Sequence, residues 1–269
     1  MSRAAHQLLD APRVLEDPVA LAIVGTDAAG GIRAATLRYR SPPARLLRAF
    51  LVARSRVAED ALGAAVSAGV RQYVVLGAGL DTFAYRNPYP ADRLTVFEVD
   101  HPATQAFKRG QLERARIALP ASLRFVPVDF ESERLPERLA SAGFRATEPA
   151  FFSWLGVSMY LTRAAIAATL GYVASLPQGS GIVFDYAVPP ERLPLVRRLA
   201  IRALLRRVAA AGEPWKTFFE PRELAAELHD LGFRELADLG SEELNARFFG
   251  ARHDHLRTGV LGRVMYATT

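Results

Sequence analysis

A glycine turn with an acid beside it is the part of this sequence whose residue types most clearly point to ligand chemistry. The apolar run at residues 72–76 stops at Gly77-Ala78-Gly79, and Leu80-Asp81-Thr82 follow. Glycines here let the chain turn sharply at the carboxyl edge of a sheet and let a ligand approach the backbone, because a Cβ would block both. The turn therefore predicts a nucleotide-type pocket centred on Gly77, Ala78, Gly79 and Asp81.

Asp81 and Thr82 separate two classes of cofactor. A dinucleotide fingerprint has glycine or alanine at the sixth position of the turn, which here is Thr82. An acid beside it would repel a pyrophosphate, whereas S-adenosyl-L-methionine (SAM) carries a positive amino group and a sulfonium. The turn favours SAM over a nicotinamide dinucleotide, which leaves a nicotinamide oxidoreductase as the less favoured alternative.

A second acidic position follows the next apolar run. Asp100 lies 21 residues beyond Gly79, close to the spacing at which an acid meets ribose hydroxyls in such folds. Glu98 would point to the same side of an extended strand, so both acids are candidate cofactor contacts. The alternative for Asp100 is that it caps a helix starting at Pro102, since acid followed by proline is a common helix start.

The elements that must position these residues alternate along the chain, as in an α/β fold with a parallel sheet. Near-continuously apolar runs predict buried strands, and the stretches between them predict helices. The expected strands are 72–76, 94–98, 123–128, 150–155 and 181–186, and the expected helices are 45–67, 102–119, 135–142 and 163–175. Residues 233–239 and 260–267 predict a final antiparallel pair at the sheet edge, with no helix between them. We expect a Rossmann-like, doubly wound sheet of about seven strands, mostly parallel.

Two segments outside this alternation are predicted to form helical lids within a single domain spanning residues 1–269. In residues 1–40 a helical piece is followed by 27–31, which predict a loop. Residues 189–222 open with Pro189-Pro190 and continue as a helix. Its apolar and arginine residues repeat every fourth position on opposite faces, which favours a helix packed on the body over one lying on a membrane surface. These stripes are Val196, Ala200, Leu204 and Val208, and Arg198, Arg202 and Arg206.

The composition excludes several classes of protein. The chain has 269 residues, half of them hydrophobic, which suffices for a sizeable core. It has no cysteine, no signal-type start and no apolar run long enough for a membrane span, so we expect a soluble, cytoplasmic protein with no membrane partner. The net charge of +6 comes from dispersed arginines rather than a basic face, so no nucleic-acid partner is expected. His253-Asp254-His255 lacks a third ligand, so no metal is expected. Arg45, Arg48 and Arg56 are expected to lie on the solvated faces of a helix.

Several of these motifs together resemble the leucine carboxyl methyltransferase-like family of class I SAM-dependent O-methyltransferases. The similarity runs from about residue 45 to 190, with a weaker match at Glu16-Asp17-Pro18. It rests on the motifs at 75–86, 97–102, 125–130, 142–144 and 157–162. This combination is much more specific than a glycine turn alone.

The resemblance implies a role for each matched residue. Gly77 and Gly79 would line the methionine part of SAM, and Arg54 would bind its carboxylate, which a guanidinium can do bidentately. Asp100 would hold the ribose, and Asp129 with Phe130 would contact the adenine. The sequence departs from the family at Leu155, where an acid usually precedes the Gly-Val of the fourth strand's motif. One polar contact to the cofactor would then be missing or supplied elsewhere.

The expected reaction is an in-line displacement in which the protein supplies proximity, orientation and exclusion of water. A carboxylate acceptor needs no base, whereas a hydroxyl acceptor needs one near the sulfonium. Tyr160 is the leading candidate, with a packed surface tyrosine as the alternative. Asp185 and Tyr186 end the fifth strand, where residues face the site. The acceptor is expected to be a small molecule, because kinship of fold does not set the substrate. A non-catalytic SAM-binding module of the same fold is the alternative that Leu155 favours.

Overall fold

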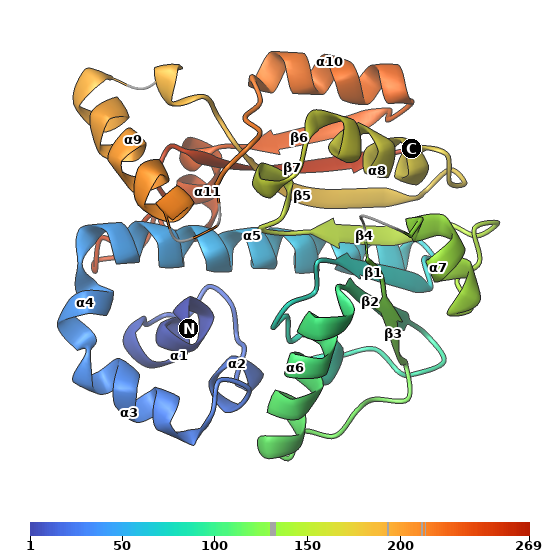
Figure 1. Cartoon of the computed structure of the whole chain (residues 1–269), viewed down its shortest axis with the longest axis horizontal. Helices are drawn as coiled ribbons and strands as arrows, with labels where there is room; N and C mark the ends of the chain where they lie inside the picture. Colours follow the sequence, from blue (N-terminus) through green and yellow to red (C-terminus); the bar gives the residue numbers. More distant parts are fainter. Residues whose placement is uncertain (130–132, 193, 211, 213) are drawn as a thin grey trace.

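A seven-stranded sheet in the order β3-β2-β1-β4-β5-β7-β6 organises the chain (Figure 1). The computed structural model describes residues 1–129, 133–192, 194–210, 212 and 214–269. The strands are β1 (Gln72–Leu76), β2 (Thr95–Asp100), β3 (Leu123–Pro127), β4 (Phe151–Trp154), β5 (Gly181–Ala187), β6 (Glu235–Leu239) and β7 (Gly262–Thr268). The predicted Rossmann-like sheet and its antiparallel C-terminal pair are confirmed.

The register of the strands brings their carboxyl ends to one edge. β1 pairs in parallel with β2 on one side and β4 on the other, and the parallel set continues to β3 and β5. β7 then runs antiparallel between β5 and β6. Because strand order reverses at β1, this edge of β1 and β4 is where such folds open a crevice. This edge is where the predicted site residues gather.

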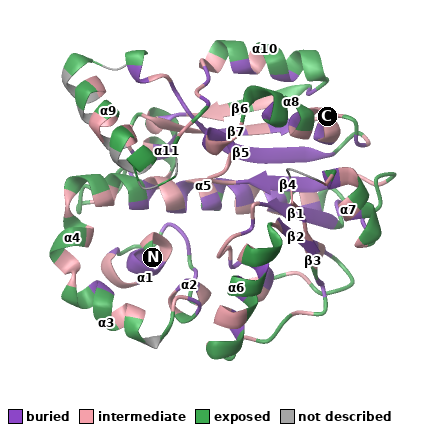
Figure 2. Cartoon of the chain, in the orientation of Figure 1, coloured by how far each residue is buried: buried purple, intermediate pink, exposed green. Residues whose placement is uncertain are grey.

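Helices cover both faces of the sheet, and its central strands β1, β2, β4 and β5 are buried between them (Figures 1 and 2). One face packs against α7 (Leu135–Ser141), α8 (Arg163–Ala174) and α10 (Pro221–Leu231). The other packs against α5 (Pro42–Ser67) and α11 (Ser241–Phe248), with α6 (Pro102–Arg114) beside them. α5 begins after Ser41 with two prolines, a usual helix start, and its buried face includes Val52, Ala53, Leu62 and Val66. Fully buried side chains on both faces of one sheet explain why the strands read as continuous apolar runs.

The N-terminal segment forms a small layer of its own below α5 (Figure 1). It comprises α1 (Ser2–Leu9), α2 (Val19–Ala22), α3 (Thr26–Ala34) and α4 (Thr36–Arg40). Ala4, Ala5 and Ile32 are buried at its centre. The expected loop at 27–31 is therefore wrong, because those residues lie inside α3. The helix persists despite Gly30 and Gly31 since Ile32 buries its side chain completely against α1.

Two other expectations about elements are corrected. The helix α11 does separate β6 from β7, with Leu244 fully buried on it, whereas no helix was expected there. The segment 189–222 is not one helix: the short turn Pro190–Arg192 precedes α9 (Leu195–Ala210), and residues 214–220 are extended or irregular before α10. Arg202 and Arg206 of α9 are exposed, as the stripe predicts, but Val196, Ala200, Leu204 and Val208 lie outside the described side chains.

Within the part of the chain that the structure describes, no helix has both the length and the apolar character that crossing a membrane requires. The same residues contain no group of three or more His, Asp or Glu side chains placed to hold a metal ion.

Candidate functional site

A cavity of about 380 Å³ lies at the carboxyl edge of β1 and β4. This volume falls within the range of small-molecule sites. Its walls come from four parts of the chain: the end of β1 with the turn after it, the end of β4, the middle of α5, and the N-terminal helices. Among the described residues, the wall includes the predicted Arg54, Gly77, Ala78, Gly79, Asp81 and Leu155, together with residues that the sequence did not single out, such as Arg3, Ile23, Leu51 and Ser153.

The two glycines of the turn have different structural roles. Both have positive φ angles, +63° at Gly77 and +43° at Gly79. A Cβ on Gly77 would lie 2.5 Å from Cγ2 of Val157, so this glycine lets the loops after β1 and β4 meet. A Cβ on Gly79 would meet nothing nearer than the Gly77 carbonyl oxygen at 3.9 Å. Gly79 is therefore the glycine whose missing side chain leaves space for a ligand.

Asp100 is bound to that turn. Its carboxylate accepts hydrogen bonds from the backbone N–H groups of Gly79 and His101. The N-terminus of α6 is capped by His101, whose Nδ1 accepts from Ala103 N at 3.2 Å. The residue that caps α6 is therefore His101 and not Asp100. Asp100 sits where the ends of β1 and β2 meet, outside the cavity wall.

Glu98 is not part of the cavity wall and lies in a buried polar cluster. Its Oε2 lies 2.7 Å from Nζ of Lys108 and accepts from the Tyr85 hydroxyl at 3.2 Å, and both charged side chains are almost fully buried. Burial raises the pKa of Glu98 to about 7 even though Lys108 opposes the shift. Oε1 of Glu98 has no hydrogen-bond partner among the described residues. In this conformation Glu98 is engaged with α6 rather than with the cavity.

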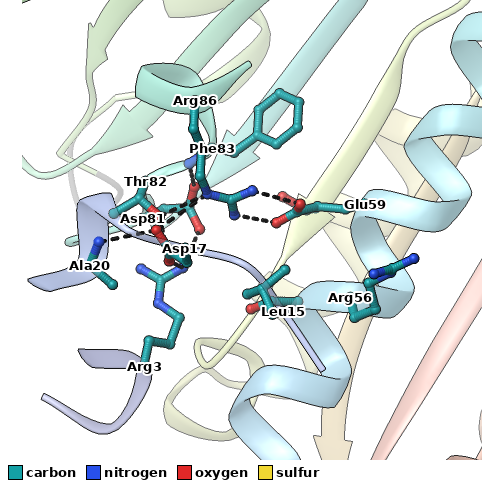
Figure 3. A network of polar contacts seen from close by, with 12 residues as sticks. Arg3, Leu15, Asp17, Ala20, Arg56, Glu59, Asp81, Thr82, Phe83 and Arg86 are labelled. Atoms are coloured by element: carbon teal, nitrogen blue, oxygen red, sulfur yellow. Dashed lines mark hydrogen bonds and ion pairs between the residues drawn. The ribbon is translucent and has the colours of Figure 1, made fainter. Parts of the chain in front are cut away.

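Asp81 is held from the N-terminal segment. Arg3 on α1 donates to Oδ2 of Asp81 at 3.0 Å and to the Leu80 carbonyl, and Oδ1 accepts from Phe83 N (Figure 3). Burial opposes ionisation of Asp81, but Arg3 and Lys108 outweigh it, and the pKa of Asp81 lies below its usual value. The acid predicted to favour a cationic ligand is therefore ionised, and it already has one cation beside it.

A second set of contacts ties the N-terminal segment to the same turn (Figure 3). Asp17 is fully buried and accepts from the Thr82 hydroxyl at 2.7 Å and from Ala20 N at 3.0 Å. Arg86 lies 3.3 Å from Asp17 and forms a two-pronged ion pair with Glu59 of α5. In the Glu16-Asp17-Pro18 motif, it is therefore the aspartate that connects the N-terminal segment to the glycine turn.

Arg54 reaches the cavity from α5 and is anchored on β5. Its Nη1 donates to Oδ2 of Asp185 at 2.5 Å, and Oδ1 of Asp185 accepts from Gly156 N at 2.5 Å. Gly156 has a φ of +80°, and a Cβ there would lie 2.8 Å from Nη2 of Arg54. Nε of Arg54 is buried without a partner among the described residues. Leu155, next to Gly156, forms part of the cavity wall.

The remaining predicted residues that the structure describes do not belong to the cavity wall. Asp129 follows β3 at the same sheet edge, and its N–H donates to Glu133 at 2.9 Å. Tyr160 ends the short 3₁₀ helix Ser158–Tyr160 after β4 and is half-buried. Phe130 lies outside the described residues. An earlier expectation that Arg48 is solvated is wrong: it is buried and pairs bidentately with Asp10, at 2.6 and 2.9 Å.

Comparison with known proteins identifies the family. The model of the leucine carboxyl methyltransferase family matches residues 1–174, which include the whole cavity wall. The chain belongs to the leucine carboxyl methyltransferase family. The match covers the N-terminal segment as well as the glycine turn, so the contacts of Asp17 and Arg3 lie inside the family's region.

Proteins similar to this chain have provisional names. YktD of Bacillus subtilis, provisionally named as an S-adenosyl-L-methionine-dependent methyltransferase, is 40% identical over 76% of this chain and 67% of its own length. A protein of a Mycobacterium species (strain JLS), with the same provisional name, is 34% identical over 75% of this chain and 60% of its own length. The matched part of the chain therefore spans about 60 to 67% of these relatives.

A solved structure supports the architecture. Magnesium protoporphyrin IX methyltransferase of Synechocystis, with bound SAH (S-adenosylhomocysteine), superposes with a TM-score of 0.50 and 13% identity, covering 94% of this chain and 99% of that one. At this identity the likeness concerns the fold alone, which is that of the class I methyltransferases.

Proposed function

We propose that this chain is a SAM-dependent O-methyltransferase that methylates a carboxylate or hydroxyl oxygen of a small molecule. The observation that carries the proposal is the cavity, which brings the glycine turn and Arg54 together at the edge of β1 and β4 in a member of this family. The provisional names of the relatives support the choice of cofactor. Residues 1–40 and 189–222 are proposed as lids of a single domain.

The residues around the cavity fit SAM in two respects. The unpartnered Nε of Arg54 marks a buried cationic group with unused donors, as a carboxylate ligand would require. The space beside Gly79 allows a ligand to lie against the backbone. For the ribose hydroxyls we propose Asp100, which is held at the end of β2 by the same turn, and for the adenine Asp129, which follows β3 at that sheet edge.

The chain's own part in catalysis is to bind and orient. SAM supplies a methyl group on a sulfonium, which is activated enough for direct displacement by an oxygen nucleophile. Arg54 and Asp129 would fix the two ends of the cofactor and Asp100 its ribose, and the N-terminal helices would exclude water from the wall they form. A hydroxyl acceptor would need a base, for which Tyr160 remains the candidate, whereas a carboxylate acceptor would not.

Titration calorimetry with SAM tests the cofactor site. We expect Arg54→Ala and Gly79→Val each to abolish measurable binding while circular dichroism shows an unchanged fold. Arg54→Ala removes the carboxylate's partner, and the valine at position 79 fills the space against the backbone. Dissociation constants like that of the wild type in both variants would mean that the site is misplaced.

A radiolabelled methyl-transfer assay against pools of small acids and alcohols tests the reaction. Methyl esters release methanol in mild base, whereas methyl ethers do not, so the product's lability identifies the acceptor atom. SAM binding without transfer to any pool would favour the alternative, a non-catalytic SAM-binding module. Tighter binding of a nicotinamide dinucleotide than of SAM would instead favour an oxidoreductase.

A further inference from the structure

The acidic residue that contacts Arg54 at the cavity is Asp185 on β5. Asp185 has no exposed surface, and it stands near the carboxyl end of its strand, two residues before β5 ends. Its two oxygens serve two different loops: Oδ2 faces Nη1 of Arg54 and Oδ1 accepts from Gly156 N. The backbone carbonyl of Asp185 also accepts from the Ser158 hydroxyl at 2.5 Å. One residue thus fixes both α5 and the loop after β4.

Asp185 contacts only one of the three nitrogen atoms of the Arg54 guanidinium. A guanidinium has five N–H donors, and the contact with Asp185 involves Nη1 alone. Nη2 lies over Gly156, whose missing Cβ makes room for it, and Nε is buried with no partner among the described residues. Nε itself has almost no exposed surface, but Arg54 lines the cavity and 16% of its side chain remains exposed. An acceptor that enters the cavity can therefore reach guanidinium N–H donors that Asp185 does not engage.

We infer that Asp185 is a positioning residue that holds Arg54 ready for the carboxylate of the cofactor, and thereby makes the site selective for ligands that carry one. The inference rests on the proposed function of the cavity. Leu155 fits this arrangement, because the acid that Arg54 needs comes from β5 and not from the position before Gly156.

The variant Asp185→Asn tests this arrangement with almost no change of shape. The position needs two acceptors, one for Gly156 N and one for Arg54, and an asparagine amide offers only one. If its oxygen keeps Gly156, its NH₂ group faces Nη1 of Arg54, donor against donor. We therefore expect the guanidinium to be displaced while the loop after β4 stays in place.

The measurement compares two ligands by titration calorimetry or displacement. SAH carries the amino-acid carboxylate, whereas 5′-methylthioadenosine shares its adenosine and thioether but lacks that group. In Asp185→Asn we expect the ratio of the two dissociation constants, methylthioadenosine over SAH, to fall at least tenfold, through weaker SAH binding alone. An Asp185→Glu variant, which restores two acceptors, should recover part of the ratio.

An unchanged ratio, or equal weakening for both ligands, would overturn the inference, because Asp185 would then only hold the fold together. Tighter SAH binding would also overturn it, since Asp185 would then act as a competing acid. If Asp185→Asn fails to fold, Gly156→Ala displaces the same guanidinium with Asp185 intact, and the same ratio decides. A wild type that binds neither ligand would contradict the proposed function itself.

Discussion

Gly156 shows how a single missing side chain sets the geometry of a charged group. Its backbone has the positive φ that glycine tolerates, and the guanidinium of Arg54 occupies the space that a Cβ would need. Gly69 also has a positive φ, +107°, at the end of α5, but an added Cβ there would meet nothing within 4 Å. Both glycines therefore need a positive φ angle, but an added Cβ would meet a neighbouring side chain only at Gly156.

This difference gives a matched pair of substitutions. Gly156→Ala and Gly69→Ala should each cost about 1–2 kcal/mol of folding free energy, since a left-handed conformation is unfavourable for alanine. Only Gly156→Ala should also weaken SAH binding, by tenfold or more, because its Cβ displaces Arg54. Urea unfolding and calorimetry measure the two effects. Equal SAH affinity in the two variants would mean that Arg54 does not contact the ligand.

For single residues, the sequence predicted which side chains line the cavity better than it predicted which side chains contact one another. Arg54, Gly79 and Asp81 were found from motif and charge, and they line one cavity. That Arg3 would neutralise Asp81 could not be predicted, because nothing in the first nine residues indicates which loop α1 would face. Arg48 was misjudged for the same reason: a charged residue on a helix is usually solvated, and its burial depends on Asp10 lying opposite.

At the scale of elements, α1 depends on ionised acids for its position. Asp10, just after α1, contacts both His6 and Arg48 in the buried interior of the segment, and Asp81 contacts Arg3. Burial opposes ionisation of Asp10, but His6 and Arg48 bring its pKa below the usual 3.8, as Arg3 does for Asp81. An acid whose pKa is lowered by folding stabilises the fold above its unfolded pKa, and this stability disappears as the pH falls through the folded value.

We therefore expect α1 to detach before the sheet unfolds as the pH is lowered below 3.8. Hydrogen exchange, corrected for the intrinsic pH dependence, should show loss of protection in residues 2–9 at a higher pH than in β1. An Asp10→Asn variant should already lack part of that protection at pH 5. Simultaneous loss of protection in α1 and β1 would contradict this, because the two would then unfold as one unit.

The elements that the sequence missed were decided by tertiary burial. In α3, two consecutive glycines each cost about 1 kcal/mol relative to alanine, so a loop was the reasonable local prediction. In α11 a local signal did exist: Glu242 and Glu243 lie in the first turn, and Glu243 accepts from Gly240 N at 2.8 Å. The helix has only eight residues, too few for its period to stand out beside the flanking strands. The strand runs were easier, because burial on both faces leaves an unmistakable apolar pattern.

At the scale of the whole molecule, one buried polar network joins three regions that lie far apart in sequence. Asp17 comes from the N-terminal segment, Glu59 from α5, and Thr82 and Arg86 from the turn after β1 (Figure 3). Breaking a buried ion pair by removing one partner leaves uncompensated polar groups, which is costly. The network therefore couples the stability of the N-terminal segment to the shape of the ligand site.

Asp17→Ala measures this coupling. We expect it to lower the free energy of unfolding by roughly 3–5 kcal/mol, since Thr82, Ala20 N and Arg86 lose a fully buried acceptor. The neighbouring Glu16→Ala is the control: Glu16 is exposed and pairs only with Arg13 among the described residues, so its loss should cost about 0.5 kcal/mol or less. Urea denaturation gives both values. Similar small losses in the two variants would show that the network contributes little.

The place of α1 in the cavity wall has a consequence for the rate of turnover. Met1, Ser2, Arg3 and Ala4 border the space where the cofactor would lie, so a cofactor that leaves or enters past this wall would have to displace the helix. Such opening motions limit turnover in many enzymes that act quickly on their substrates. The release of product, more than the transfer of the methyl group, would then set the pace of the catalytic cycle, and the residence time of SAH would report the lifetime of the Arg3–Asp81 contact.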